Sequence, residues 1–267
     1  MKTKKSTALV TPKKHLGQHF LTDETVALRI VQALSQSPEA VLEIGPGMGV
    51  LTKYLLKNPD SKKLYFCEID VESVNFLRHH YHLKEELLEA DFLQLDLTNF
   101  GQNLGVIGNF PYHISTQIMF HILEYREQII EVVGMFQKEV AVRLAAQPNT
   151  KNYGILTVLL QAFYDIEYLF TVEANAFHPP PKVQSGVIRL VKNSDKKLKS
   201  PYANFKKVVK AAFNQRRKTL KNALTAVFDL QHRTDFTDSI WSKRAEQLSV
   251  AEFDDLTMLI FRDSKVF

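Results

Sequence analysis

The chain has 267 residues, enough for one large domain and a small second one. Its composition, 45% hydrophobic and 24% charged, excludes intrinsic disorder over the whole length. A single cysteine, Cys67, excludes an internal disulfide, and no apolar run reaches the roughly 18 to 20 residues of a membrane span, so we expect a cytoplasmic protein without a membrane partner.

The net charge of +5 is unevenly distributed. Residues 1–14 contain five lysines and no acidic residue, and residues 196–221 contain ten Lys or Arg and no acidic residue, so the rest of the chain is net negative. Two basic segments suit a polyanionic partner, because neutralised phosphates release their counterions. Charge runs also occur on solvated tails and helix faces, so charge alone leaves both interpretations open.

In chain order, residues 1–14 predict a flexible arm, and Thr22-Asp23-Glu24 caps an apolar-periodic run that predicts a helix ending near residues 35–38. Strand-like and helix-like segments then alternate, which predicts a parallel sheet with helices on both faces. The expected strands are 41–44, 64–69, 86–90, 105–109 and 131–136, and the expected helices are 50–58, 71–82, 114–124 and 138–146.

Two later runs, 156–170 and 187–191, are expected to supply the last strands of this sheet. A Lys- and Ser-rich stretch at 194–200 is typical of a linker. Beyond it, apolar residues recur at helical spacing, which predicts a small helical domain. The expected organisation is therefore a flexible basic arm at 1–14, an α/β domain at 15–195 and a helical domain at 196–267.

A glycine-rich turn follows the first expected strand. In Glu43-Ile44-Gly45-Pro46-Gly47-Met48-Gly49 the glycines permit a tight turn and a close approach of backbone to ligand. Such a turn also fits a plain loop or an NAD site. The G-x-G-x-G spacing and an acidic Glu43, which would repel a pyrophosphate, disfavour NAD. The sulfonium of S-adenosylmethionine tolerates that carboxylate, so Glu43, Gly45 and Gly47 are candidate cofactor contacts.

Two acidic residues follow the next strands. Glu68 ends the second strand, where a carboxylate can accept hydrogen bonds from both hydroxyls of a ribose. Asp91 ends the third, where it can accept one from the adenine amine of a cofactor. Either acid alone would fit an ordinary surface position, but together with the glycine turn they favour a nucleoside cofactor. The histidines and the lone cysteine have no spacing that predicts a metal site.

The segment Asn109-Phe110-Pro111-Tyr112 ends the fourth strand. An amine on an aromatic ring is a poor nucleophile, because its lone pair is delocalised. The carboxamide oxygen of Asn109 and the carbonyl of Phe110 or Pro111 can accept its two N–H groups and align the lone pair for attack on a sulfonium methyl group. Tyr112 offers a ring on which an extruded base can stack. In isolation the segment also fits a strand-terminating turn, but its place after the cofactor turn favours catalysis.

Six motifs, in the same order along residues 13 to at least 224, resemble those of the KsgA family of rRNA adenine dimethyltransferases. They are Lys14-His15-Leu16-Gly17-Gln18-His19-Phe20-Leu21, Glu43 to Gly49, Asn109 to Ser115, Gln137-Lys138-Glu139-Val140, Phe177-His178-Pro179-Pro180-Pro181-Lys182-Val183 and Phe213-Asn214-Gln215-Arg216-Arg217-Lys218-Thr219-Leu220.

This resemblance implies a class I S-adenosylmethionine-dependent methyltransferase, Rossmann-like, with a mainly parallel seven-stranded sheet and a small helical C-terminal domain. It implies S-adenosyl-L-methionine as methyl donor. The implied substrate is two adjacent adenines near the 3′ end of small-subunit (16S) rRNA, in an immature 30S-type particle. Both adenines would become N6,N6-dimethyladenine during ribosome biogenesis, and the enzyme would act as a monomer.

The resemblance also assigns site residues. Phe177 would be a second aromatic face for the base, although it also fits a hydrophobic anchor for its loop. His19 and His113 stand where the family usually has asparagine. Carried over from the family, the cofactor contacts are His19, Leu21, Gly45, Glu68, Asp91 and Asn109, and the basic motif Arg216, Arg217 and Lys218 would bind RNA phosphates or have a structural role at the domain junction.

Three other functions fit parts of the pattern. Erm methyltransferases, which modify one adenine of large-subunit rRNA, share Asn-x-Pro-Tyr, but the runs 177–183 and 215–220 favour the KsgA family. A non-catalytic RNA-binding assembly factor would not need Asn109, Tyr112 and both strand-end acids. An NAD-dependent oxidoreductase is disfavoured by Glu43 and by the lack of a hydride-transfer acid or base near Asn109.

Overall fold

The computed structural model describes residues 10–57, 63–228, 230 and 239–262. The chain divides into two compact units, Met1–Ala141 with Tyr168–Val191 and Val142–Glu167 with Lys192–Phe267. This division differs from the predicted boundary near residue 195, because residues 142–167 group with the C-terminal helices.

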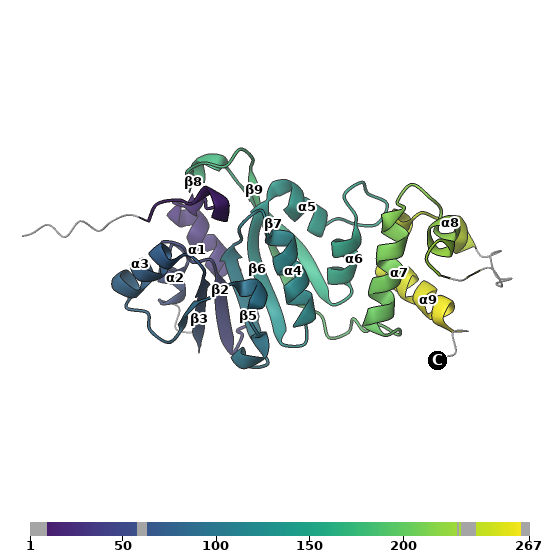
Figure 1. Ribbon diagram of the computed structural model, residues 1–267, viewed down its shortest axis with the longest axis horizontal. Coiled ribbons are helices and arrows are strands. Elements are labelled where there is room, and N and C mark those ends of the chain that lie inside the picture. Colours follow the sequence, from purple (N-terminus) through teal and green to yellow (C-terminus); the bar gives the residue numbers. More distant parts are fainter. Residues whose placement is uncertain (1–9, 58–62, 229, 231–238, 263–267) are drawn as a thin grey trace, which may run out of the picture. The chain divides into compact units, whose positions relative to one another are not determined.

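Seven strands form one sheet in the order β4-β3-β2-β5-β6-β9-β7 (Figure 1). Within this sheet, strands β2 to β6 pair in parallel, and β9 pairs antiparallel with β6. These pairings confirm the predicted, mainly parallel seven-stranded sheet. The strands are β2 (Ala40–Ile44), β3 (Leu64–Glu68), β4 (Leu87–Glu89), β5 (Leu104–Asn109), β6 (Ile129–Gln137), β7 (Tyr164–Val172) and β9 (Ser185–Lys192).

The position of β2 in the sheet determines where a ligand can bind. All five β2 residues are buried, which requires cover on both faces of the sheet. On one face, apolar side chains from three helices form a core with Val41, Phe66 and Ile107. The chain goes from β2 to β3 on one side and later returns to β5 on the other, so a crevice opens beyond the carboxyl ends of β2 and β5. The three helices are α1 (Glu24–Gln32), α2 (Thr52–Leu55) and α3 (Val71–Tyr81).

A second sheet of two short strands was not predicted. β1 (Phe20–Leu21) pairs antiparallel with β8 (Phe177–His178), with Leu21 opposite Phe177. Two residues per strand are too few for a periodic signal, and the partners are more than 150 residues apart. The pairing holds the segment around His19 against the proline-rich loop that follows β8.

Part of the predicted flexible arm is packed. Residues 1–9 lie outside the described residues, but Val10 is buried, and Lys13 forms an ion pair with Asp70 at the N-terminus of α3. Asp70 also accepts hydrogen bonds from Gln18 and from Ser73. Residues 10–14 thus differ from the expected mobile tail, because a buried carboxylate supplies a partner that composition alone does not reveal.

The C-terminal unit contains the predicted helices. Phe205, Val208 and Phe213 are buried on α7, which packs against α6, α8 and α9. The predicted linker is partly fixed, since the backbone N–H groups of Lys199 and Ser200 donate to Asp254. The helices are α6 (Ile155–Gln161), α7 (Tyr202–Asn214), α8 (Leu220–Thr225) and α9 (Val250–Phe261); α4 (Ser115–Glu124) lies in the first unit, and α5 (Lys138–Leu144) crosses the division.

The prediction of one strand over 156–170 was wrong in its first half. Residues 155–161 form α6, and β7 begins only at Tyr164. Thr157 to Leu160 are all buried, and a continuously apolar run has no periodicity that separates a buried helix from a buried strand. None of the described helices is long and apolar enough to cross a membrane.

Candidate active site

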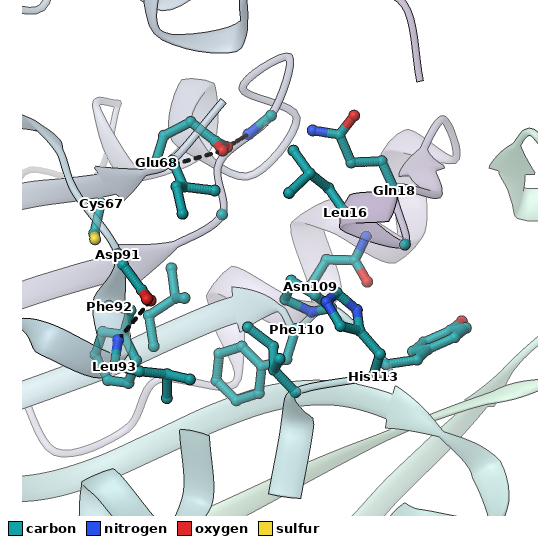
Figure 2. A pocket seen from close by; sticks show the side chains of 18 of the residues that line it. Leu16, Gln18, Cys67, Glu68, Asp91, Phe92, Leu93, Asn109, Phe110 and His113 are labelled. Atoms are coloured by element: carbon teal, nitrogen blue, oxygen red, sulfur yellow. Dashed lines mark hydrogen bonds between the residues drawn. The ribbon is translucent and has the colours of Figure 1, made fainter. Parts of the chain in front are cut away.

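A cavity of about 250 Å³ opens at the crevice (Figure 2). In Figure 2, Glu68 and Asp91 lie on one side of the cavity, and Asn109 and His113 on the other. The cavity joins the ends of four strands with the N-terminal segment. Of the predicted site residues, it is lined by His19, Gly45, Gly47, Glu68, Asp91, Asn109, Pro111 and Tyr112.

The glycine turn has the backbone that its composition predicts. Gly45 and Gly47 have φ values of 64° and 57°, in the left-handed region that favours glycine. A Cβ on Gly47 would lie 2.9 Å from the Phe20 ring, whereas a Cβ on Gly45 would meet no protein atom within 4 Å. Gly45 therefore leaves open space in the cavity, and a ligand can approach its backbone closely.

The carboxylate of Glu68 is held by backbone groups. One oxygen accepts from the N–H of Gly47 at 2.9 Å, and the other accepts from the N–H groups of Ile69 and Asp70, both at 2.9 Å. Burial raises the pKa of Glu68, although these N–H donors oppose the shift. The three bonds fix the carboxylate at the cavity wall and leave one lone-pair site for a ligand hydroxyl.

Glu43 does not line this cavity. Its side chain is 1% exposed and accepts a hydrogen bond from the Thr52 hydroxyl at 2.7 Å. Glu43 and Leu21 instead line a small neighbouring pocket of about 30 Å³, together with Gly45, Gly47 and Asn109. In this arrangement Glu43 supports the glycine turn through α2, and Leu21 belongs to the apolar core.

Burial raises the pKa of Glu43 to about 8, from a usual value of 4.5. The folded protein therefore binds this proton more tightly than the unfolded chain does. The resulting stabilisation is complete below about pH 4.5 and is lost as the pH rises through about 8. We expect Glu43→Gln to remove this dependence, so that chemical unfolding shows a smaller loss of stability between about pH 5 and about pH 9 than in the parent protein. Equal slopes for both proteins would contradict the prediction.

The wall around Asp91 suits an adenine ring. One Asp91 oxygen accepts from the N–H of Leu93 at 2.9 Å, and the apolar side chains of Phe92 and Leu93 line the cavity beside it. The other oxygen can accept a hydrogen bond from an exocyclic amine.

Burial raises the pKa of Cys67 to about 12, so this thiol remains protonated and unreactive.

The amide of Asn109 has a defined orientation. Its Nδ2 donates to the backbone carbonyl of His19 at 2.9 Å. A carbonyl can only accept, so the nitrogen faces His19 and the carboxamide oxygen remains available as an acceptor. The N-terminal segment thereby orients the side chain that sequence analysis placed at the reacting amine.

Tyr112 is fixed at both ends of its side chain. Its hydroxyl is 2.6 Å from the Ser185 hydroxyl, and its ring stacks with His19 at 5.7 Å between ring centroids. Burial raises the pKa of Tyr112, so the hydroxyl stays protonated. Ser185 was missed by sequence analysis, because it lies 73 positions away on β9, which is antiparallel to β6. No local signal marks it.

Phe110 occupies space that glycines leave. A Cβ on Gly108 would lie 2.7 Å from the Phe110 ring, and one on Gly134 would lie 2.5 Å from it. The ring is 1% exposed and packs edge-on against Phe136. Two adjacent strands therefore determine how the backbone of Phe110 and Pro111 leaves the sheet.

Phe177 lies elsewhere than expected. Its side chain is 4% exposed, belongs to the core cluster with Leu21 and α1, and does not line the cavity. In this structure the ring packs in the core, and its role as a second stacking surface stays a prediction. The packing corresponds to the alternative, a hydrophobic anchor for the loop. Through β8 it positions Pro179, whose carbonyl contacts His19 Nδ1 at 2.8 Å.

We expect Phe177→Ala to destabilise the protein by about 3–5 kcal/mol, the usual cost of emptying a buried aromatic site. Phe177→Leu keeps most of the apolar volume and should cost less than about 1.5 kcal/mol while retaining activity per folded molecule. Urea unfolding combined with a methyl-transfer assay separates the two roles. A stable but inactive Phe177→Leu protein would support the stacking role.

The predicted RNA-binding residues lie in the C-terminal unit and differ from one another. Arg216 donates through Nε to Glu246 at 2.6 Å and through Nη2 to the Lys151 carbonyl at 2.7 Å, so its guanidinium has a structural role within the unit. Arg217 and Lys218 are exposed. Among the described residues, no group of three His, Cys, Asp or Glu side chains could hold a metal ion.

Comparison with known proteins agrees with this geometry. A family model described as "Ribosomal RNA adenine dimethylase" matches residues 10–260. The chain is 55% identical to "Ribosomal RNA small subunit methyltransferase A" of Cytophaga hutchinsonii, over 94% of this chain and 98% of the relative. It is 52% identical to the protein of the same name from Flavobacterium johnsoniae, over 95% and 97%.

Solved structures have the same fold. A dimethyladenosine transferase from Plasmodium falciparum is similar with a TM-score of 0.77 and 26% identity, covering 91% of this chain and 98% of that one. The 23S rRNA methyltransferase ErmE is similar in fold, with a TM-score of 0.67 and 24% identity, covering 88% and 98%. Both matches extend over the two units.

Proposed function

Because the chain belongs to the ribosomal RNA adenine dimethylase family, we propose that it dimethylates the N6 amines of two adjacent adenines near the 3′ end of small-subunit rRNA with S-adenosylmethionine. The observation that carries this proposal is one cavity that joins Glu68 and Asp91 to Asn109 and Tyr112. The first pair suits a nucleoside cofactor, and the second suits an aromatic amine.

The cavity residues fit the cofactor. The fixed carboxylate of Glu68 would accept a ribose hydroxyl, Asp91 would accept the adenine amine, and the open side of Gly45 would let the ligand reach the backbone. When bound, the cofactor supplies a methyl group on a cationic sulfur. The acidic side chains in the cavity tolerate that cation, whereas they would repel a phosphate.

The acceptor amine would be held by the strand end. The Asn109 carboxamide oxygen accepts one N–H, and the carbonyl of Phe110 or Pro111 accepts the other, so the nitrogen lone pair is directed into the cavity. The Tyr112 ring, held by Ser185 and His19, would stack on the base. With N6 held in this way, the cofactor would supply its methyl group as the sulfur–carbon bond breaks, and the proton displaced from N6 would leave for water.

RNA binding is assigned mainly to exposed basic side chains. Arg217 and Lys218 would contact phosphates, and Arg216 would hold their loop through Glu246. We further propose that the chain acts as a cytoplasmic monomer on an immature 30S-type particle. These finer points rest on the family resemblance and on the basic segment at 196–221.

The decisive experiment is methyl transfer from labelled S-adenosylmethionine to immature small subunits and, separately, to large-subunit rRNA, followed by nucleoside analysis. We expect N6,N6-dimethyladenine in the small subunit only. Label in large-subunit RNA would instead assign an Erm-like activity. RNA binding without label in either substrate would indicate an assembly factor without catalysis.

A further inference from the structure

A second hollow, of about 440 Å³, lies beside the cofactor cavity. Four residues, Gly17, His19, Tyr112 and His113, line both spaces and form the boundary between them. A Cβ on Gly17 would lie 2.8 Å from His113 Nδ1, so the glycine makes room for this imidazole at the boundary. An acceptor base that reaches Asn109 from the hollow would pass these residues.

The two spaces carry opposite charges. Among the described residues, the cavity is lined by Glu68 and Asp91 and by no lysine or arginine. In the same part of the chain, the residues that line the hollow are Lys14, His15 and Gln137 in addition to the shared ones, and none is acidic. The charge of the lining thus changes from negative to positive across the Tyr112 boundary. The negative side suits a cationic cofactor, and the positive side suits an anionic polymer.

Two adjacent lysines have different environments. Lys13 pairs with the buried Asp70 and lies 3.5 Å from Glu72, so its charge is neutralised within the protein. Burial raises the pKa of Asp70, but hydrogen bonds from Lys13, Ser73 and Gln18 outweigh it and lower the pKa overall. Lys14 is exposed on the hollow, and within the described part of the chain it forms no ion pair.

Local geometry explains the difference. Lys14–Leu16 form one turn of 3-10 helix that ends at Gly17, whose φ of 60° reverses the chain and whose N–H donates to the Lys14 carbonyl. The Lys13 N–H donates to Gln18 Oε1 at 2.8 Å, which closes the segment on itself. The turn thereby places the two ammonium groups in separate environments.

We propose that the hollow holds the sugar–phosphate backbone of the acceptor nucleotide, with the Lys14 ammonium group on its phosphate. The inference rests on the proposed function and names a contact beside the catalytic strand end. Lys13 serves a different purpose, since it ties the N-terminal segment to Asp70, two residues after the cofactor carboxylate Glu68.

The test compares Lys14→Gln with the matched control Lys13→Gln in the full chain. Binding of an RNA fragment from the 3′ end of small-subunit rRNA is measured without cofactor over a range of salt concentrations, and binding of S-adenosylhomocysteine is measured separately. We expect Lys14→Gln to weaken RNA binding roughly two- to fivefold. It should also lower the salt slope by about 0.7 to 0.9 and leave nucleoside binding unchanged.

Lys13→Gln should leave the salt slope unchanged and lower the melting temperature. An unchanged slope for Lys14→Gln, or an equal decrease for both variants, would overturn the proposal. Because the binding measurement requires no turnover, it is separate from the methyl-transfer assay. Failure of the parent protein to methylate small subunits would count against the proposed function and not against this contact.

Discussion

Asn109→Ala should reduce methyl transfer to small-subunit rRNA by about 100-fold or more, the usual cost of removing one pre-oriented polar group from a transition state. Because Nδ2 donates to the His19 carbonyl, the Asn109 oxygen is the atom available to the proposed acceptor amine. Alanine removes this acceptor and leaves the cofactor contacts of Glu68 and Asp91 in place. Single-turnover transfer at saturating cofactor measures the effect.

The matched control is Asn103→Ala. Asn103 directly precedes the same strand at its other end, and its side chain bonds only to the exposed Glu39. We expect this variant to retain parental activity. Asn109→Asp is a second comparison. The aspartate keeps an acceptor oxygen, but the oxygen that would face the His19 carbonyl cannot donate a hydrogen bond to it. Activity of Asn109→Ala near the parental value would exclude the proposed role of the amide.

Glu68→Ala should weaken cofactor binding by about 10- to 100-fold, because one hydrogen bond to a charged group contributes about 1.5–3 kcal/mol. The change also leaves the N–H groups of Gly47, Ile69 and Asp70 without their acceptor and loosens the glycine turn. Calorimetric titration with S-adenosylhomocysteine measures the loss. Transfer at saturating cofactor should recover much of the activity, since Asn109 and Tyr112 are unchanged.

Glu89→Ala controls for a lost carboxylate. Glu89 is the residue opposite Glu68 in the β3–β4 pair, but it is exposed and does not line the cavity. The Glu89→Ala variant should bind the cofactor with the same affinity as the parent protein. If Glu68→Ala does not fold, its cofactor affinity cannot be measured. Glu68→Gln retains the shape of the side chain and one acceptor oxygen, and its cofactor affinity is then measured instead. Parental affinity in folded Glu68→Gln and Glu68→Ala would remove Glu68 from the cofactor site.

Some of these features follow from short stretches of sequence. The strand ending at Ile44, the glycine turn and the acid at Glu68 occur in an order that only a parallel sheet brings to one edge. Asn109 was predicted for the same reason, since it ends the strand next to β2. These positions depend on local backbone preference and on the alternation of strand-like and helix-like segments along the chain. Both can be recognised in the sequence itself.

Other features depend on contacts between distant segments. Residues 155–161 are apolar throughout, so only packing against α7 and α9 decides that they form a helix. Phe177 is buried because β8 pairs with β1, a contact that spans more than 150 residues. The same pairing places His19 against Asn109 and Pro179.

The sequence alone therefore predicted the parallel strands, the cofactor turn and the strand end at Asn109, because each depends on a short stretch of neighbouring residues. Only the tertiary structure decided that Phe177 packs in the core, that Arg216 pairs with Glu246, and that Lys13 faces Asp70 while Lys14 faces the hollow. The physical reason is that a side chain's partner and exposure are fixed by what folds against it. Neighbouring residues of the same type can thus have different roles.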